Sequence, residues 1–451
     1  MGRLFGTDGV RGIANTELTC ELAFDIGRAA ALVLAKDGRR RPVFVIGTDT
    51  RASADMLVAS LTAGLCSVGA DVIQLGVIPT PAVAFLVGKY KADAGIVVSA
   101  SHNPAPFNGI KIFSGDGYKL PDELEGAIES MVLRKRTEYP KPIGGEVGRV
   151  TVVTQAARDY IDHLKSTVLY MPEGMHIAVD CANGAASTTA AQLFNELGCK
   201  VEILSNTPNG TNINEGCGST HLEQLSAFVR EHGCDLGIAF DGDADRCLCV
   251  DHTGEVVDGD RIMAICSLDL RERGKLPSNT VVGTIMTNFG FTRFCEENGL
   301  QFIATKVGDR FVLEEMLLGG YAFGGEQSGH IIFRDFATTG DGQLTAVQLL
   351  SYLKRCGRPL HELAQVMSQY PQYIINLKVT AEGKRHFFTN SAIKASMADA
   401  KTALGTTGRI VVRPSGTEPL IRVMAEGEDE ELTRAQAEAV AAVIREQLSE
   451  K

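Results

Sequence analysis

Three aspartates alternate with small residues directly after an apolar run, in the order Asp241, Asp243 and Asp245. Carboxylates this close repel one another unless a cation holds them, and hard oxygen ligands favour Mg²⁺ or Ca²⁺. A calcium loop of the EF-hand type needs glycine at its sixth position and glutamate at its twelfth, where this chain has Arg246 and His252. The sequence therefore predicts a site for a divalent cation of another type, with a solvated acidic turn as the alternative.

A serine stands in a second loop, Ser99–Pro104 (SASHNP), which follows the β-branched run 96–98. Open α/β sheets keep their chemistry at such strand ends, so Ser101 is a candidate nucleophile, with an ordinary strand-to-loop junction as the alternative. Neighbouring residues that leave a strand point to opposite faces, which predicts that His102 is poorly placed as a base for Ser101. The chain contains no GxSxG elbow and no Walker P-loop, which disfavours the corresponding hydrolases and kinases.

Two further glycine-bearing loops offer groups that bind polar ligands. The loop 324–330 (GGEQSGH) carries a carboxylate, an amide, a hydroxyl and an imidazole, which suit the hydroxyls of a sugar, although a histidine there is more often structural. The loop 413–419 (RPSGTEP) combines one fixed cation with two hydroxyls and glycine-freed backbone N–H groups, which suit a phosphate. Arg422 could add a second cation or face solvent on a strand.

Alternating strands and helices position these loops. This alternation occurs three times along the chain. In each repeat one strand ends at a polar loop, which is the serine loop, the aspartate loop or the loop 324–330. This repetition predicts three similar α/β domains with mostly parallel sheets. The expected strands are 43–46, 71–75, 95–98, 176–179, 200–204, 236–240, 280–286, 301–305 and 321–323. The expected helices are 21–36, 53–68, 81–89, 187–197, 221–232, 292–297 and 309–316. Strands 373–380 and 408–412 and a helix at 428–448 predict a smaller C-terminal α+β domain that contains antiparallel strands.

Length and composition bound the possible functions. A chain of 451 residues is too long to fold around a single hydrophobic core, and we expect domains at 1–150, 151–256, 257–368 and 369–451. A hydrophobic content of 44% and a charged content of 22% are typical of a soluble globular protein. The net charge of −11 argues against a nucleic-acid partner. Eleven cysteines without CxxC pairs predict reduced, buried thiols, and the absence of a signal core or membrane-length run predicts a cytoplasmic protein without a membrane partner.

The order of the loops carries a resemblance to a known family. SASHNP, then Asn108–Lys111 (NGIK), DGDADR, GEQSGH and RPSGTEP span essentially the whole chain and resemble the α-D-phosphohexomutases. The resemblance implies an α/β fold of three similar domains and a smaller fourth around a central active-site cleft. The opening FGTDGVRG is most similar to the branch that acts on glucosamine phosphates. That branch implies an isomerase of glucosamine 6-phosphate and glucosamine 1-phosphate, feeding amino-sugar nucleotide synthesis for cell-wall precursors. Mannose or glucose phosphates, and a Mg²⁺-dependent sugar phosphatase, are the alternatives.

The resemblance also implies residue roles. Ser101 would carry the phosphoryl group, and one Mg²⁺ would be held by that phosphate with Asp241, Asp243 and Asp245. The other implied roles are proton transfer by Lys111 and His330, cleft positions for Arg11 and Arg246, sugar binding by Glu326 and Ser328, and phosphate binding by Arg413, Ser415, Gly416 and Thr417. A sugar 1,6-bisphosphate would be both intermediate and activator, and closure of the fourth domain would need a hinge near Met367–Tyr373. The resemblance alone allows a homodimer.

Overall fold

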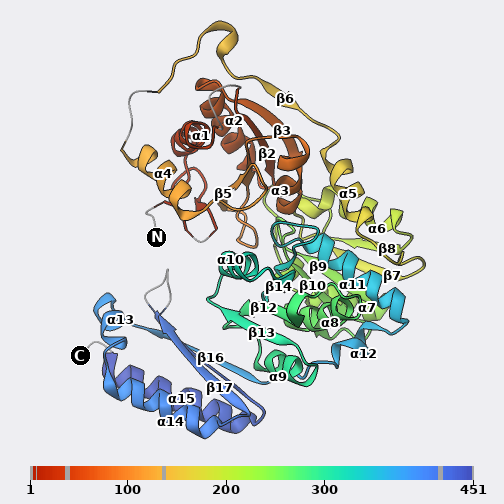
Figure 1. The fold of residues 1–451 in the computed structure, drawn as a ribbon, viewed down its shortest axis with the longest axis vertical. Coiled ribbons are helices and arrows are strands. Elements are labelled where there is room, and N and C mark those ends of the chain that lie inside the picture. Colours follow the sequence, from red (N-terminus) through yellow and green to blue (C-terminus); the bar gives the residue numbers. More distant parts are fainter. Residues whose placement is uncertain (1–3, 7, 36–40, 135–138, 415–419, 449–451) are drawn as a thin grey trace. The chain divides into compact units, whose positions relative to one another are not determined.

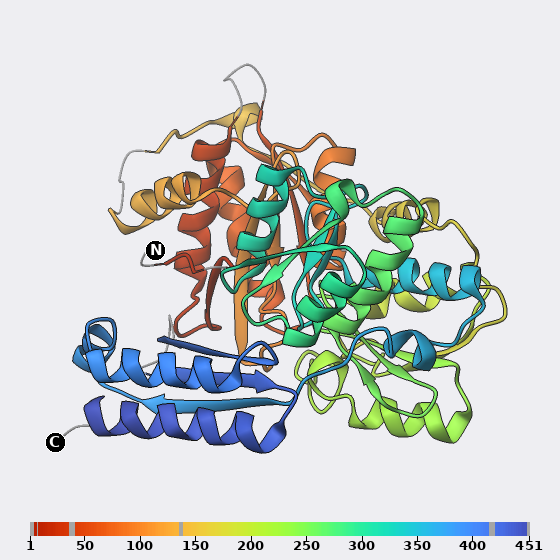
Figure 2. The same cartoon turned by 60° about the horizontal axis from the view of Figure 1, so that its bottom comes forward.

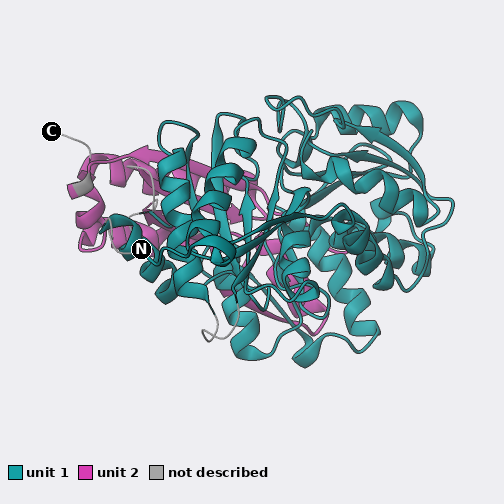
Figure 3. Ribbon diagram, turned by 90° about the horizontal axis from the view of Figure 1, so that it is seen from above, with its two compact units in different colours: residues 1–284, 305–365 teal, residues 285–304, 366–451 magenta. Residues whose placement is uncertain are grey.

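The structure is a computed structural model that describes residues 4–6, 8–35, 41–134, 139–414 and 420–448. The chain forms two compact units, one of residues 1–284 with 305–365 and the other of residues 285–304 with 366–451 (Figure 3). The first unit holds three sheets with their helices, and the second holds a smaller sheet.

The first sheet has six strands in the order β1-β5-β4-β2-β3-β6. Its strands are β1 (Val10–Ile13), β2 (Val43–Thr48), β3 (Asp71–Val77), β4 (Ala94–Val98), β5 (Phe107–Ser114) and β6 (Val150–Val152). The predicted strands β2, β3 and β4 are confirmed and run parallel, whereas β1 and β5 are antiparallel strands that the sequence did not predict. The register of β5 on β4 sets Ile110 opposite Val98 and Lys111 opposite Val97. Lys111 is thereby carried on a core strand.

Helices cover both faces of this sheet (Figure 1). They are α1 (Cys20–Leu34), α2 (Ala54–Ser67), α3 (Thr80–Lys89) and α4 (Asp122–Leu133). Buried residues of α1, α2 and α4 share one core with alternate residues of β2, β4 and β5, while α3 packs on the other face. All five residues of β4 are buried because helices cover both faces of the sheet, which explains why this strand is a continuous apolar run in the sequence.

The second sheet has the order β11-β10-β9-β7-β8. Its strands are β7 (His176–Asp180), β8 (Lys200–Leu204), β9 (Leu236–Phe240), β10 (Cys247–Asp251) and β11 (Val256–Val257), and its helices are α5 (Ala156–Ser166), α6 (Ala190–Glu196) and α7 (Glu223–His232). The predicted strands β7, β8 and β9 are parallel, and β10 adds an antiparallel strand after the aspartate loop. The predicted helix 187–197 is broken, because a 3₁₀ turn (Ala185–Thr188) precedes α6.

The third sheet of the first unit contains β12 (Thr280–Thr284), β14 (Phe323–Gly325) and β15 (Ile331–Phe333). Its helices are α8 (Gly259–Glu272), α10 (Asp309–Gly319), α11 (Gly342–Cys356) and α12 (Leu360–Ala364). Nearly all of α11 is buried, against elements of both the second and the third sheet. The sequence did not predict α11, because a helix that is buried all round shows no amphipathic period.

The second unit has three antiparallel strands in the order β16-β18-β17 (Figure 2). Its elements are β16 (Gln372–Lys378), β17 (Gly408–Pro414), β18 (Leu420–Gly427), α9 (Phe289–Glu297), α13 (Ala381–Phe387), α14 (Ser391–Leu404) and α15 (Glu430–Leu448), with most of β13 (Gln301–Thr305). Apolar residues of α14 and α15 cover one face of its sheet. The predicted smaller domain is confirmed, although its central strand β18 and helices α13 and α14 were not predicted.

The state of the cysteines and the hydrophobicity of the helices bear on two predictions from the sequence. All eleven cysteines are free thiols and eight are buried. Among the residues that the structure describes, no helix is long and apolar enough to cross a membrane.

Candidate active site

The turn after β4 presents Ser101 in an unusual backbone conformation. Ser101 has φ +52°, in the left-handed region that a residue with a side chain seldom adopts, and it is 1% exposed. Its Oγ donates a hydrogen bond of 2.6 Å to Asp241 Oδ2, which follows β9 of the second sheet. The structure therefore brings the predicted serine and the predicted aspartate loop together. Non-glycine residues with positive φ cluster at functional sites, where the strain of about 1–3 kcal/mol is held by surrounding contacts.

The expectation that Ser101 and His102 point to opposite faces is wrong, whereas the statement that His102 is poorly placed as a base stays a prediction. Nδ1 of His102 lies 3.3 Å from Oγ of Ser101, within hydrogen-bonding distance. Strand alternation does not apply here because the chain turns at Ser101. Burial, with the nearby charges of Arg246 and Arg11, lowers the pKa of His102 to about 4, so its ring is neutral near pH 7.

The aspartate loop gathers three carboxylates that are almost fully buried. Asp241, Asp243 and Asp245 offer oxygens within 4.8 Å of one another, and Oδ1 of Asp243 accepts no hydrogen bond from the described residues. Burial and the neighbouring carboxylates of Asp245 and Asp243 raise the pKa of Asp241 well above its ordinary value. Buried carboxylate oxygens that lack donors fit a hard divalent cation. The turn also requires φ +57° at Ala244, a conformation that glycine adopts more easily.

Lys111 of β5 enters this cluster from the first sheet. Its Nζ lies 2.8 Å from Asp243 Oδ2, 3.6 Å from Asp245 Oδ2 and 3.0 Å from Asp8 Oδ2, and the residue is 2% exposed. Burial alone would lower the pKa of Lys111, but these carboxylates raise it above its usual value. Lys111 is therefore a buried cation whose charge is shared among three carboxylates.

Further ion pairs close a ring of alternating charges around the site. Lys119 Nζ lies 2.5 Å from Asp8 Oδ1 and also pairs with Asp309, the first residue of α10. His330 Nε2 lies 3.4 Å from Asp309 Oδ2, and its Nδ1 lies 3.5 Å from Asp245 Oδ1. We call this set the charge ring; its members are Asp8, Lys111, Asp245, His330, Asp309 and Lys119. Sequence reasoning missed Asp8, Lys119 and Asp309, although Asp8 stands in the FGTDGVRG segment that carried part of the resemblance.

His330 has a hydrogen-bonding partner in each of its protonation states. Burial would lower its pKa, but Asp245 and Asp309 raise the pKa of His330 to about 9. The backbone N–H of Gly340 donates to Nε2 at 3.1 Å, which suits the neutral ring, while Asp309 faces the same nitrogen when it is protonated. Gly340 packs directly on the imidazole, because a Cβ there would lie 2.4 Å from Nε2. The position of the ring thus depends on a glycine at residue 340.

The predicted arginines border the same loops. Arg11 donates to Asp8 and, at 3.2 Å, to Asn103 Oδ1 in the serine loop. Nε of Arg246 lies 4.0 Å from Asp245 Oδ1, and the charge of Glu326 acts on the same guanidinium. Both guanidiniums are partly exposed, so they are available to an anionic ligand.

The loop after β14 places its polar residues beside the N-terminus of α10. Glu326 Oε1 accepts a hydrogen bond of 3.1 Å from the backbone N–H of Gly308. Burial and the charge of Asp309 raise the pKa of Glu326 above its ordinary value. Ser328 is half-buried in the same tight turn, and His330 completes it. The structure therefore brings Glu326 and His330 into contact with one helix end.

The second unit carries the last predicted loop. Arg413 on β17 stands opposite Arg422 on the neighbouring strand β18, and burial together with Arg422 lowers the pKa of Arg413. Arg422 Nε donates to Asn376 Oδ1 at 2.9 Å. Within the described ranges, neither arginine pairs with a carboxylate. Ser415, Gly416 and Thr417 lie outside the described residues.

Comparisons with known proteins place the chain in a family. Models of the phosphoglucomutase/phosphomannomutase α/β/α domains I, II and III match residues 2–139, 158–254 and 258–370, and that of the C-terminal domain matches residues 374–443. The chain belongs to the phosphoglucomutase/phosphomannomutase family. This confirms the predicted fold class of three α/β domains and a distinct C-terminal domain.

Individual members of this family are similar to the chain over its full length. The chain is 54% identical over 449 residues to the phosphoglucosamine mutase of Thermoanaerobacter sp. (strain X514), covering 100% of both chains. It is 52% identical to the phosphoglucosamine mutase of Symbiobacterium thermophilum, covering 99% of this chain and 100% of the relative. A phosphoglucomutase/phosphomannomutase family protein from Burkholderia thailandensis has a similar fold, with a TM-score of 0.84 at 24% identity and coverage of 98% and 97%.

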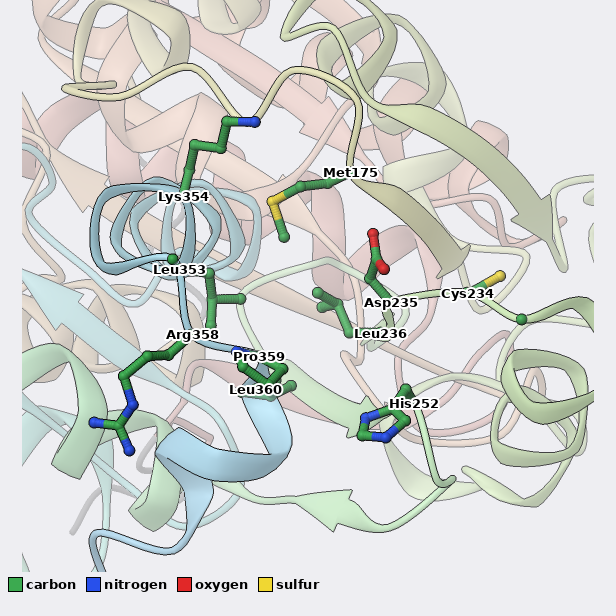
Figure 4. Close-up of a pocket in the computed structure, with 12 residues that line it drawn as sticks. Met175, Cys234, Asp235, Leu236, His252, Leu353, Lys354, Arg358, Pro359 and Leu360 are labelled. Atoms are coloured by element: carbon green, nitrogen blue, oxygen red, sulfur yellow. The ribbon is translucent and has the colours of Figure 1, made fainter.

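A cavity away from the three loops of the first unit has Asp235, His252, Lys354 and Arg358 among its titratable lining residues. It has a volume of about 750 Å³ and is lined largely by apolar residues such as Leu236, Leu353 and Leu360 (Figure 4). Beside it, Asp251 and His361 are in contact at 2.7 Å, with Glu255 nearby. Asp251 Oδ1 already accepts hydrogen bonds from the backbone N–H groups of Thr253 and Glu255. These contacts stabilise the hairpin of β10 and β11, so the cluster is explained by the fold.

Proposed function

We propose that this chain interconverts glucosamine 6-phosphate and glucosamine 1-phosphate by phosphoryl transfer through Ser101. The observation that carries the proposal is the strained, buried Ser101 whose Oγ is bonded to Asp241 in a cluster of three carboxylates. The names of the relatives at 50–54% identity support glucosamine as the sugar. Mannose or glucose phosphates remain the alternative substrates within the same family.

Mg²⁺ is the proposed cofactor. Asp241, Asp243 and Asp245 would hold it, because the buried Oδ1 of Asp243 has no hydrogen-bond donor among the described residues and the set contains only hard oxygen ligands. The phosphate on Ser101 would be a further ligand. When bound, the cation neutralises negative charge on the transferred phosphoryl group.

The proposed reaction has two half-reactions that mirror each other. The free hydroxyl of the 6-phosphosugar attacks the phosphorus on Ser101, a new P–O bond forms to the sugar, and the P–Oγ bond of Ser101 breaks. The proton of the sugar hydroxyl leaves to a base as the reaction proceeds. Ser101 Oγ then attacks the other phosphorus of the 1,6-bisphosphate, and the bond between that phosphorus and the C6 oxygen of the sugar breaks. The C6 oxygen takes up a proton, glucosamine 1-phosphate leaves, and Ser101 is phosphorylated again.

Side chains around Ser101 are assigned to the remaining tasks. Lys111 and His330 hold and move protons, and Arg11 and Arg246 attract the phosphates. Glu326 and Ser328 bind sugar hydroxyls, and Arg413 grips the phosphate that does not react, with Ser415, Gly416 and Thr417. A hinge near 367–373, a homodimer and a cytoplasmic location complete the proposal; the hinge and the homodimer rest on the family resemblance.

Substitution of the serine tests the mechanism most directly. Ser101→Ala should abolish conversion of glucosamine 6-phosphate, measured with a trace of bisphosphate as primer, and should not acquire the mass of one phosphoryl group. Ser166→Ala, at the exposed last residue of α5, is the control and should change neither the conversion rate nor the phosphorylated mass. An active Ser101→Ala variant would overturn the mechanism. Turnover of glucosamine, mannose and glucose phosphates decides the sugar, and net release of inorganic phosphate would instead indicate a phosphatase.

A further inference from the structure

A buried guanidinium lies beneath the Ser101 loop. The side chain of Arg51, between β2 and α2, is fully buried and directs four hydrogen bonds to backbone carbonyls of the loop. Its Nη2 donates to the carbonyls of Ser101 at 3.0 Å and Asn103 at 2.7 Å. Its Nη1 donates to the carbonyls of Pro104 at 2.6 Å and Phe107 at 3.0 Å. One planar cation thus binds three carbonyls of the turn between β4 and β5 and the carbonyl of the first residue of β5.

The fifth donor of this guanidinium connects it to the N–H side of Ser101. Arg51 Nε donates to Asp49 Oδ2 at 2.9 Å, and Ser99 Oγ donates to the same oxygen at 2.5 Å. The backbone N–H of Ser101 in turn donates to Ser99 Oγ at 2.9 Å. We call Asp49, Arg51 and Ser99 the loop clamp, because they hold Ser101 through both its N–H and its carbonyl.

The loop clamp explains how the chain keeps Ser101 at φ +52°. A non-glycine residue in this region persists only when its surroundings determine its conformation. Four carbonyls that converge on one buried point would repel one another without a cation between them. Asn214 of the second sheet's domain adds hydrogen bonds to the same carbonyls of Ser101 and Asn103, at 2.9 and 3.1 Å. The backbone of the phosphate carrier is therefore fixed from two domains before any ligand arrives.

We propose that Arg51 is a positioning residue for phosphoryl transfer, which fixes Ser101 Oγ against Asp241 without itself touching substrate. The inference rests on the proposed function of Ser101. Because Arg51 acts on the phosphate carrier, its loss lowers kcat and leaves KM for the sugar phosphate nearly unchanged. Lysine cannot replace it, since a point charge with three donors cannot serve four carbonyls and Asp49 in the planar arrangement of arginine.

Two variants of the clamp separate positioning from folding. Arg51→Lys keeps the charge, and the double variant R51Q/D49N removes both charges so that no buried carboxylate is left unpaired. Both should lower kcat about 100-fold, the cost expected when a reacting group moves by about 1 Å. Arg28→Gln is the matched control, because Arg28 packs on the Tyr139 ring in the same domain and does not contact the loop. It should retain wild-type kcat.

A second readout follows Ser101 itself. The rate at which unphosphorylated Ser101 takes a phosphoryl group from glucosamine 1,6-bisphosphate, measured by intact-protein mass, should fall as kcat does. Amide hydrogen exchange at residues 99–107 should speed up in both clamp variants and not in the control. If the wild type fails to convert glucosamine phosphates, the proposed function fails, and the exchange rates still judge the clamp. If folded Arg51→Lys or R51Q/D49N keeps wild-type kcat and exchange rates, the inference is overturned. Should both variants fail to fold, Ser99→Ala removes one contact and must show the same changes in smaller degree.

Discussion

Two regions of the molecule hold their cations in opposite electrostatic surroundings. In the first unit, Lys111 lies among three carboxylates, which raise its pKa above the usual value. In the second unit, Arg413 stands opposite Arg422 across a strand pair, and burial together with this second cation lowers its pKa. One region surrounds a cation with excess negative charge, and the other sets two positive charges side by side.

The opposite charges of the two regions indicate which kind of ion each would bind. The charge ring balances three carboxylates against three cationic side chains, so Asp241 and Asp243 remain as additional buried carboxylates. A metal cation or protonation would neutralise these additional carboxylates. An anion would neutralise the two arginines, and a phosphate would match their planar donors. We therefore expect changes in the first region to alter the rate of chemistry and changes in the second to alter affinity for the phosphosugar.

Removal of Lys111 should have the largest effect. Lys111→Met takes the shared cation from Asp243, Asp8 and Asp245, and as a proton-transfer group its loss should lower kcat by about 10²–10⁴. Breaking this buried ion pair should also reduce the free energy of unfolding by about 3–5 kcal/mol. Steady-state kinetics and urea denaturation measure the two effects.

A surface pair gives the control for this variant. Lys89 forms an ion pair with Asp159 but is 41% exposed, so Lys89→Met should change kcat little and stability by less than about 1 kcal/mol. Equal effects of Lys111→Met and Lys89→Met would remove the distinction between the buried region and an ordinary surface pair.

The sequence predicted local parts of this site better than distant ones. The alternating Asp241, Asp243 and Asp245 after β9 are a local pattern, so their cluster was expected and found. Lys119 and Asp309 are 190 positions apart, and a single sequence does not reveal that they pair. Strand β5 was missed because Asn108, Gly109 and Lys111 interrupt its apolar pattern. His102 was misplaced because strand alternation was extended through a residue with positive φ.

A substitution that changes no charge tests whether the position of His330 within the charge ring affects catalysis. A Cβ at residue 340 would lie 2.4 Å from the His330 ring, so Gly340→Ala must displace the imidazole from Asp245 and Asp309. Displacement by about 1 Å should lower kcat roughly 100-fold. Gly88→Ala is the control, because a Cβ at Gly88 meets no atom within 4 Å. A fully active Gly340→Ala variant would show that His330 is not required at this position.

The paired arginines should give the smallest effect, and in a different kinetic parameter. A hydrogen bond between charged groups contributes about 1.5–3 kcal/mol, so Arg413→Gln should raise KM for the phosphosugar roughly 10- to 100-fold and leave kcat nearly unchanged. Arg422→Gln should raise KM less, because the Arg422 side chain already donates a hydrogen bond to Asn376. Added salt should weaken binding in the wild type more than in Arg413→Gln, since the lost interaction is between charges. A fall in kcat at constant KM would contradict the comparison, because it would mean that the like-charged pair serves the chemical step rather than retention of the phosphate.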